Sequence, residues 1–318
     1  MEISLKQSTG PGKKKSPFLA EMKTNWVLYL MAVPGIAFFF IFRYIPMAGI
    51  LMAFKNFNYR DGLWKSPWVW FKNFEFFFRS AAFPSVVYNT IILSSLGILL
   101  GTCVSVGLAL ALNEIKHNLV KRVSQSVMIF PNFISAVAVS VIVYNIFSYK
   151  YGIANQIREW LGMQPRDWYT NSLEWVFYYL GVGIWKSAGY SSIVYLAAIS
   201  GISPELYESA EIDGAGRAQQ LWYITLPCIK PVIIMLFILS VGSILTSDAG
   251  SIWLLIGDRA NLFEHMDTID TFVFRMVRTN PNVGRTTAVG LIQSVCCFFI
   301  VVGVNRLTKK IYPEGAIF

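Results

Sequence analysis

Six long apolar stretches, separated by polar connections, organise the sequence. A helix that crosses a bilayer needs about 20 apolar residues, because the hydrocarbon core is about 30 Å thick. The stretches that meet this requirement are Trp26–Ala48, Val86–Leu112, Val123–Phe147, Trp175–Ser200, Cys228–Ala249 and Thr286–Leu307. The pattern therefore predicts an all-α membrane protein whose six transmembrane helices occupy residues 26–307.

Short polar tails flank the predicted spans. Residues 1–25 are basic and lack apolar periodicity, which predicts an N-terminal tail, and residues 308–318 form the C-terminal tail. The first apolar stretch is too long for a signal-peptide core and ends in Arg43-Tyr44-Ile45-Pro46, without a small-residue cleavage site. We therefore expect it to be retained as the first helix.

Composition supports the membrane assignment. The chain is 55% hydrophobic and 14% charged, whereas an ordinary soluble domain carries about 25% charged residues. A soluble body with a mean hydropathy of +0.51 would expose large apolar patches to water. This composition excludes an ordinary soluble globule.

The basic residues carry information about orientation. Short connections rich in Lys and Arg face the cytoplasm. Such connections are the two tails and the loop 113–122, so we expect both termini to be cytoplasmic. The opposite side also carries basic residues, but they lie in longer loops mixed with acids, which weigh less. The net charge of +9 is divided almost evenly between the two sides and so carries only modest topological information, and no nucleic-acid partner is expected.

Residues suited to catalysis are sparse. The cysteines, which lack CxxC spacing and lie in or beside predicted spans, are Cys103, Cys228, Cys296 and Cys297. The histidines are His117 and His265, in connections predicted to lie on opposite sides of the membrane. The tail string Gly10-Pro11-Gly12-Lys13 does not fit the phosphate-loop spacing. We expect no metal site, no cofactor and no enzymatic activity in this chain, so a partner or an ion gradient must supply energy for any uphill step.

A polar loop over residues 201–227 connects the fourth and fifth spans on the predicted cytoplasmic side. Ser203 before Pro204 predicts a helix start, and Glu205 in the first turn suits the positive end of the helix dipole. Asp213-Gly214 predicts the helix end, because glycine accepts a left-handed cap. A second short helix is expected over Arg217–Tyr223, before Pro227 opens the next span.

The spacing in this loop resembles the signature of the permease subunits of ATP-binding-cassette (ABC) importers. That signature is EAA, three residues, G, nine residues, then I-x-L-P. Here it reads Glu208-Ser209-Ala210, Gly214, Ile224 and Leu226-Pro227, with Ser in place of the middle Ala. The loop residues that the resemblance assigns to ATPase coupling are Glu205, Glu208, Ser209, Ala210, Asp213, Gly214, Ala215, Ile224, Leu226 and Pro227.

The resemblance extends to the first span and outer loop, where Arg43-Tyr44-Ile45-Pro46-Met47, Ala53–Phe57 and Ser66-Pro67-Trp68 look like the oligosaccharide and polysaccharide group of maltose-type permeases. It implies a type I importer fold in a bacterial cytoplasmic membrane. It also implies half of a pathway for ATP-driven uptake of a carbohydrate. The implied partners are a second, distinct permease, two ATPases that bind ATP and Mg, an extracytoplasmic binding protein and the lipid bilayer.

Polar and aromatic side chains inside the spans are candidates for the substrate path. Lys186 is costly in lipid and is expected to face the bundle interior or a wet cavity. The other candidates are Asn89, Asn145, Tyr190, Tyr195, Asp248 and Gln293. Each of them can instead make an interhelical hydrogen bond, and Lys186 can reach outward to the interface.

Two other classes fit less well. An ion-coupled secondary transporter needs carboxylates at mid-membrane, and the predicted spans hold almost none away from their ends. A membrane-embedded enzyme needs clustered His, Asp or Arg near a membrane face, which the sequence does not show. A permease of the same class for a different solute stays open, as do the identity, length and charge of the sugar.

Overall fold

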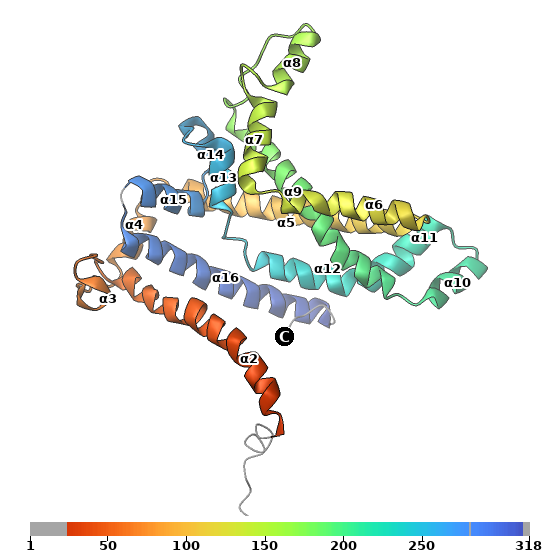
Figure 1. Ribbon diagram of the computed structural model, residues 1–318, viewed down its shortest axis with the longest axis horizontal. Helices are drawn as coiled ribbons and strands as arrows, with labels where there is room; N and C mark the ends of the chain where they lie inside the picture. The colour runs from red at the N-terminus through yellow and green to blue at the C-terminus, as the bar shows by residue number, and fades with distance from the viewer. Residues whose placement is uncertain (1–23, 280, 314–318) are drawn as a thin grey trace, which may run out of the picture. The chain divides into compact units, whose positions relative to one another are not determined.

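The computed structural model describes residues 24–279 and 281–313, which are helical apart from short connections (Figure 1). They divide into two units, residues 24–51 and 52–313. These described residues form no β-strand, and one isolated bridge pairs Lys55 with Trp68. The prediction of an all-α protein is confirmed.

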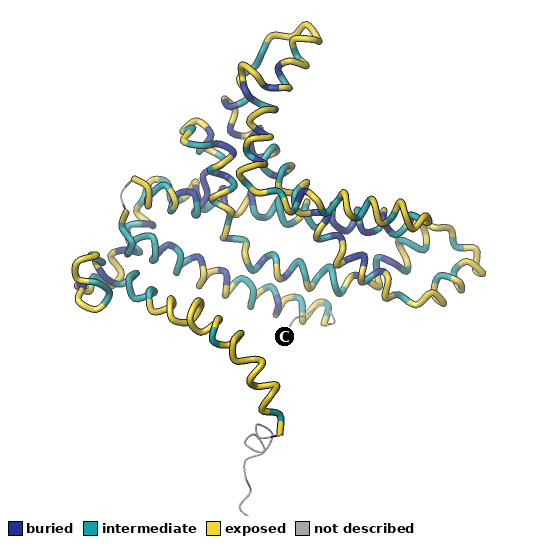
Figure 2. The backbone as a smooth tube through the Cα atoms, in the orientation of Figure 1, coloured by how far each residue is buried: buried dark blue, intermediate teal, exposed yellow. Residues whose placement is uncertain are grey.

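The first unit is one continuous apolar helix. Helix α2 (Trp26–Phe39) leads into a π-helical turn (Phe40–Tyr44) and then into a 3-10 segment (Ile45–Phe54), where the second unit begins. None of the residues of α2 is buried (Figure 2). Most of its large apolar side chains are more than half exposed. A helix that is apolar on every side suits a lipid environment.

Two π-helical turns allow helices to continue past a proline. The turn Phe40–Tyr44 precedes Pro46, and the turn Leu221–Thr225 precedes Pro227. In both places the amide after the turn bonds to a carbonyl five residues earlier. The wider turn moves the carbonyl that a proline ring would otherwise strike, so the helix continues past the proline.

Four long helices dominate the second unit. They are α5 (Phe83–Glu114), α9 (Ser172–Ser200), α12 (Leu226–Val241) and α16 (Val283–Ile311). Helices α5 and α9 pack along each other, and α12 contacts α5, α9 and α16 (Figure 1). The shorter helices are α3 (Gly62–Lys65), α4 (Lys72–Phe78), α6 (Asn118–Ile129), α7 (Ala136–Phe147), α8 (Ile153–Trp160), α10 (Pro204–Ile212), α11 (Arg217–Gln220), α13 (Ala249–Ile256), α14 (Phe263–Met266) and α15 (Ile269–Thr279).

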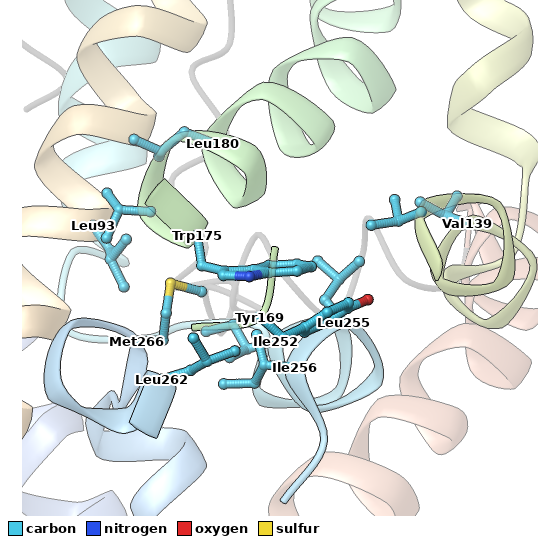
Figure 3. Packing of buried hydrophobic residues seen from close by; sticks show 12 residues of the cluster. Leu93, Val139, Tyr169, Trp175, Leu180, Ile252, Leu255, Ile256, Leu262 and Met266 are labelled. Carbon is cyan, nitrogen blue, oxygen red and sulfur yellow. The ribbon is translucent and has the colours of Figure 1, made fainter. Parts of the chain in front are cut away.

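Trp175 is the centre of the largest apolar cluster. Its side chain is fully buried among residues of α5, α7, α13 and α14, including Leu93, Val139, Ile252 and Met266 (Figure 3). The indole nitrogen donates a hydrogen bond to the carbonyl oxygen of Trp168 at 2.9 Å, so burial leaves no polar atom of the ring unsatisfied. The cluster fixes the start of α9 against the helices around it.

The third predicted span, Val123–Phe147, is not one straight helix. Asn118–Phe133 and Ala136–Phe147 meet at a bend of 95°. Pro131 lies in a 3-10 turn at the bend, and the Ser135 hydroxyl accepts a hydrogen bond from the amide of Ala138, which starts α7 afresh. The helix before the bend lies close to α9, since a Cβ on Gly189 would come within 1.8 Å of the Met128 carbonyl oxygen.

The fifth predicted span, Cys228–Ala249, also differs from expectation. Helix α12 ends at Val241, and residues 242–248 are non-helical before α13 begins. This segment, called here the span-five break, is held by α15 and α16. The Asp270 carboxylate accepts hydrogen bonds from the Ser247 amide at 2.5 Å and from Gln293 Nε2 at 3.1 Å, and Gln293 also donates to the Leu245 carbonyl at 2.8 Å.

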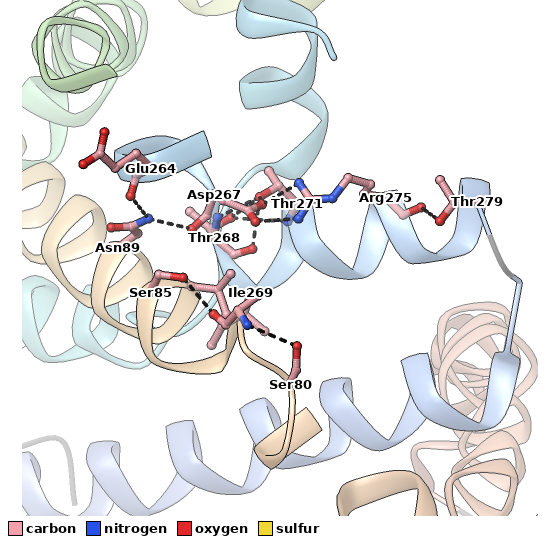
Figure 4. A network of polar contacts seen from close by, with 12 residues as sticks. Ser80, Ser85, Asn89, Glu264, Asp267, Thr268, Ile269, Thr271, Arg275 and Thr279 are labelled. Atoms are coloured by element: carbon pink, nitrogen blue, oxygen red, sulfur yellow. Dashed lines mark hydrogen bonds and ion pairs between the residues drawn. The ribbon is translucent and has the colours of Figure 1, made fainter. Parts of the chain in front are cut away.

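A buried ion pair stabilises the connection that follows. Arg275 donates to both carboxylate oxygens of Asp267, at 3.1 and 2.6 Å, and Asp267 is 5% exposed (Figure 4). Asn89 of α5 donates to the carbonyl oxygens of Glu264 and Asp267, and the Thr90 hydroxyl accepts from the Ile269 amide. These bonds join α5 to the segment between α14 and α15.

Several helices are long and apolar enough to cross a membrane. Among the described residues they are Trp26–Phe54, Phe83–Glu114, Arg217–Val241 and Val283–Ile311, and the bent pair around Pro131 makes a fifth candidate. Helix α9 has 29 residues but carries Glu174 and Lys186 and is less apolar. The chain is therefore a multi-pass membrane protein.

Candidate functional site

The polar loop between α9 and α12 folds as a helical hairpin. Helix α10 starts at Pro204, and Ser203 occupies the cap position, although its side chain makes no capping hydrogen bond. After α10, Gly214 adopts a φ of +82°. The Ala215 amide bonds to the Ala210 carbonyl at 2.8 Å, and the Gly214 amide bonds to the Glu211 carbonyl at 3.0 Å. These two bonds define a Schellman cap, for which glycine is the favoured residue.

The second half of the hairpin differs from what the sequence predicts. Instead of a separate short helix before Pro227, α11, the π turn Leu221–Thr225 and α12 form one helical stretch, Arg217–Val241. Pro227 therefore lies within a continuous helix. A displacement of the hairpin reaches the spanning helix directly, because no flexible joint separates them.

Two side-chain contacts anchor the hairpin. The Tyr207 and Thr225 hydroxyl oxygens lie 2.9 Å apart, joining α10 to the π turn, and Thr225 is buried. The Arg217 guanidinium lies 3.3 Å from the Glu114 carboxylate at the end of α5. Because both partners of that ion pair are about half exposed, its contribution to stability is small, about 0.2–1 kcal/mol.

The outer face of α10 is acidic and apolar. Glu205, Glu208, Glu211 and Asp213 are exposed, and Ile212 is 87% exposed. No ion pair involves these carboxylates within the part of the chain that the structure describes. An unpaired acidic helix with apolar side chains between its charges has the character of a docking surface for a basic partner.

The remaining loop residues of the signature are divided between surface and interior. Ser209 is exposed, and its hydroxyl donates to the Glu205 carbonyl at 2.7 Å within α10. Ile224 is half-buried, and Leu226 packs on the apolar cluster around Ile199 and Ile229. Leu226 thus attaches the hairpin to α9 and α12, which leaves the acidic face of α10 outermost.

Three neighbouring hollows follow one side of α9 and are called here the α9 corridor. Their volumes are about 270, 420 and 220 Å³. The first shares Ser187 with the second, and Gly183 and Asp248 with the third. The hydroxyl-bearing residues that line the corridor are Ser94, Thr102, Ser105, Tyr179, Ser187, Tyr190, Ser191, Tyr195, Ser240, Ser243, Thr246, Ser247 and Ser251.

The structure brings four of the seven candidate path residues to the corridor. Tyr190 and Tyr195 line the second hollow, Lys186 lines the third, and Asp248 lines the first and the third. Asp248 also caps α13, because its carboxylate accepts bonds from the Ser251 amide and hydroxyl.

The other three candidates are engaged elsewhere. Asn89 is buried and bonds to the carbonyls of Glu264 and Asp267, and Gln293 is buried and bonds to Leu245 and Asp270. Asn145 is exposed on α7 and donates to the Val141 carbonyl of its own helix. Asn89 and Gln293 therefore have the alternative role given above, a hydrogen bond to a neighbouring segment of the bundle. These two side chains position the walls of the bundle.

Sequence reasoning missed Tyr179 and most hydroxyl groups of the corridor. A signal was present in small residues at i, i+4 and i+8, the spacing that places them on one helix face. On α9 they are Gly183, Ser187 and Ser191, and on α5 they are Gly97, Gly101 and Ser105. The small residues of α5 and α9 line the same hollows, because their short side chains leave space there.

Chemistry for a metal or a redox centre is not gathered in the described residues. No three His, Cys, Asp or Glu side chains there lie close enough to hold a metal ion. The four cysteines are free, and Cys297 is the buried one among them.

Comparisons with known proteins agree with this architecture. The profile of the family described as binding-protein-dependent transport system inner membrane component matches residues 95–311. Protein LplB of Bacillus subtilis (strain 168) is 35% identical, with 96% of this chain and 99% of that protein covered. The polygalacturonan/rhamnogalacturonan transport system permease protein YteP of the same strain is also 35% identical, with 95% and 94% covered.

Solved structures give the same result. A chain of a bacterial ABC transporter involved in the import of the acidic polysaccharide alginate superposes with a TM-score of 0.83 at 36% identity, covering 93% of this chain and 99% of that one. The alginate transporter in complex with an alginate pentasaccharide-bound periplasmic protein gives 0.82 at 35% identity. The present chain belongs to the family of binding-protein-dependent transport system inner membrane components and has the type I fold of an ABC importer permease, a membrane subunit distinct from the ATPase.

Proposed function

We propose that the chain forms half of the membrane pathway for ATP-driven uptake of an oligosaccharide, and that this sugar is acidic. Two of the similar proteins are named for the transport of polymers of acidic sugars. The name of one gives polygalacturonan/rhamnogalacturonan, and the description of the other gives alginate. The corridor suits a sugar because hydroxyl and tyrosine side chains offer hydrogen bonds and stacking surfaces along its length.

One observation carries the acidic assignment. Lys186 lines the corridor, and within the described residues its ammonium group forms no ion pair, although Asp248 lines the same hollow with its carboxylate bonded to Ser251. An unpaired cation inside a membrane bundle is costly and marks a functional position. A carboxylate on the passing sugar would offset that cost, whereas a neutral sugar would not.

A single copy supplies one wall of a pathway, so the proposal includes a second, homologous permease. It also includes two ATPases, which bind ATP and Mg, and an extracytoplasmic binding protein that delivers the sugar. Six spans in a bacterial cytoplasmic membrane, with both termini in the cytoplasm, complete the arrangement. The bent pair around Pro131 would then be the third span and α9 the fourth.

The hairpin is the proposed contact with the ATPase. The exposed carboxylates of α10 would pair with basic side chains across the interface, with Glu208 as the acidic anchor. The continuous helix Arg217–Val241 would then transmit the displacement of a docked α10 to the span-five break, which forms part of the corridor wall.

The test is ATP-dependent uptake by the complete transporter in liposomes, with Glu208→Lys compared against wild type. We expect wild type to accumulate a uronate oligosaccharide with ATP and the variant to lose both uptake and co-purification of the ATPase. Glu159→Lys on α8 is the matched charge reversal, since Glu159 is also exposed, and it should retain the ATPase. Equal uptake without ATP, or a Glu208→Lys complex that transports normally, would contradict the proposal.

A further inference from the structure

A separate hollow lies outside the α9 corridor. It has a volume of about 300 Å³ and shares no lining residue with the three corridor hollows. Four tyrosines and two cations line it, namely Tyr144, Tyr149, Tyr151, Tyr169, Lys150 and Arg259. This volume is at the lower end of the range for ligand pockets, about 300–1,000 Å³, and matches a small group such as one sugar unit.

The backbone beside this hollow is rigidly held. Asn155, which is 2% exposed, donates from Nδ2 to the carbonyl oxygens of Tyr149 and Arg166 at 3.0 and 2.9 Å. Its Oδ1 accepts from the Arg166 amide and from the indole nitrogen of Trp168, both at 3.0 Å. One buried amide side chain thus connects the segment after α7 to the segment before α9, so the hollow is preorganised.

The cations of the hollow lack carboxylate partners among the described residues. The Arg259 guanidinium stacks 4.0 Å from the centre of the Tyr169 ring and donates to the Ile256 carbonyl at 2.8 Å. Lys150 is exposed and forms no ion pair there. The one acidic residue of the lining, Asp167, accepts a bond from the Tyr169 amide at 3.0 Å. The lining therefore carries a net positive charge.

The rings of Tyr149 and Tyr151 are open to a ligand. Tyr149 and Tyr151 are 55% and 75% exposed, whereas Tyr169 is 8% exposed. Burial raises the pKa of the Tyr169 hydroxyl, although the charge of Arg259 opposes this shift, so the hydroxyl is protonated at neutral pH. Exposed tyrosine faces stack on sugar rings, and guanidinium and ammonium groups bind carboxylates.

We propose that this hollow binds one uronate unit of the transported oligosaccharide before the chain of sugars enters the α9 corridor. The site rests on the proposed function, which makes the sugar acidic and puts the segments around α8 on the extracytoplasmic side. Tyr149 and Tyr151 stack on the ring, and Lys150 and Arg259 bind its carboxylate. The unit is recognised by its charge and its ring together.

The experiment uses the complete transporter in nanodiscs without the binding protein. The probes are trisaccharides of galacturonate, mannuronate and guluronate, each compared with its methyl ester, and affinity is measured by saturation-transfer NMR. Lys150→Gln and Arg259→Gln should each weaken binding of an acidic trisaccharide about five- to tenfold, and the weak binding of the ester should not change. Tyr151→Leu should weaken acid and ester alike. Lys65→Gln, an exposed cation of the first outer loop, is the control and should bind as wild type.

The outcomes separate the two proposals. A wild-type transporter that imports uronates while Lys150→Gln, Arg259→Gln and Tyr151→Leu bind them unchanged overturns the hollow and leaves the proposed function intact. A wild-type transporter that neither binds nor imports any of the acidic trisaccharides overturns both. Assembly with the ATPase and an unchanged ATPase rate show that each variant is folded, so a loss of binding by assembled variants supports the hollow.

Discussion

Tyr207 and Thr225 join the two halves of the helical hairpin between α9 and α12, with 2.9 Å between their hydroxyl oxygens. Thr225 belongs to the π turn that precedes Pro227, so this contact fastens α10 to the helix that continues into the membrane. Because Thr225 is buried, the bond is shielded from water and is stronger than a surface contact.

Tyr207→Phe should uncouple the hairpin from the spanning helix. Loss of one hydroxyl leaves α10 and its acidic face intact, so the ATPase should still bind and hydrolyse ATP. Transport per ATP should fall several-fold, because α10 is no longer held to the π turn. The measurement is the ratio of sugar imported to ATP hydrolysed in liposomes. Tyr223→Phe, at a tyrosine that is 80% exposed, is the control and should keep the wild-type ratio of sugar imported to ATP hydrolysed. The same ratio in the Tyr207→Phe and Tyr223→Phe variants would contradict the role of Tyr207.

Gly214→Ala should destabilise the cap of α10. A side chain at a φ of +82° costs about 1–2 kcal/mol, and the space around Gly214 is open, so the backbone conformation alone is responsible. We expect insertion to be normal and coupling to be reduced. Gly214→Asn should be milder, because asparagine tolerates this conformation.

Gly216→Ala is the matched control for the cap, since Gly216 has a φ of −73° and only the end of the Gln219 side chain near it. The measurement is again sugar imported per ATP. Wild-type coupling in Gly214→Ala, or equal loss in Gly216→Ala, would count against the cap as a rigid element.

Asp270→Ala should release the span-five break. The change leaves the Ser247 amide without its acceptor, whereas the Ser247 hydroxyl keeps Thr268 and Gln293 keeps the Leu245 carbonyl as partners. A buried group left unsatisfied costs about 1–3 kcal/mol. We expect a lower melting temperature and weaker transport. Asp258→Ala is the comparison, because the Asp258 carboxylate is 72% exposed and lies 3.6 Å from Arg278. Similar melting temperatures for the two variants would show that Asp270 does not hold the break.

Lys186→Met should change selectivity rather than assembly. Removal of the corridor cation should lower the rate for an acidic trisaccharide about tenfold and leave the rate for its methyl ester unchanged, as expected for loss of one charge-assisted hydrogen bond. Lys186→Arg should restore much of the rate for the acidic sugar. Initial uptake rates at saturating binding protein provide the measurement, and parallel losses for acid and ester would indicate a structural role for Lys186.

Much of the architecture could be predicted from hydrophobic pattern alone, because α5 and α16 are long, apolar and uninterrupted. Pattern could not reveal the 95° bend around Pro131, since apolar residues continue on both sides of it. The span-five break was missed for a similar reason. Its conformation depends on Asp270 and Gln293, which are distant in sequence.

The first half of the hairpin was predictable because its information is local, whereas the continuous helix through Pro227 was not. The positions of Pro204, Asp213 and Gly214 fix where α10 begins and ends. The corridor was only partly predictable, since a lone polar residue in a span can face a hollow, as Lys186 does, or hold a neighbouring helix, as Gln293 does. The choice depends on packing between helices that no single stretch of sequence contains.

The charge of the substrate is measured by comparing uptake of a uronate trisaccharide and of its methyl ester by the same liposomes. The two compounds differ in charge while sharing ring and linkage, so their ratio isolates recognition of the carboxylate. We expect ATP-dependent accumulation of the acid at a rate at least tenfold above that of the ester. Equal rates, or faster uptake of the ester, would contradict an acidic oligosaccharide as the substrate of this permease.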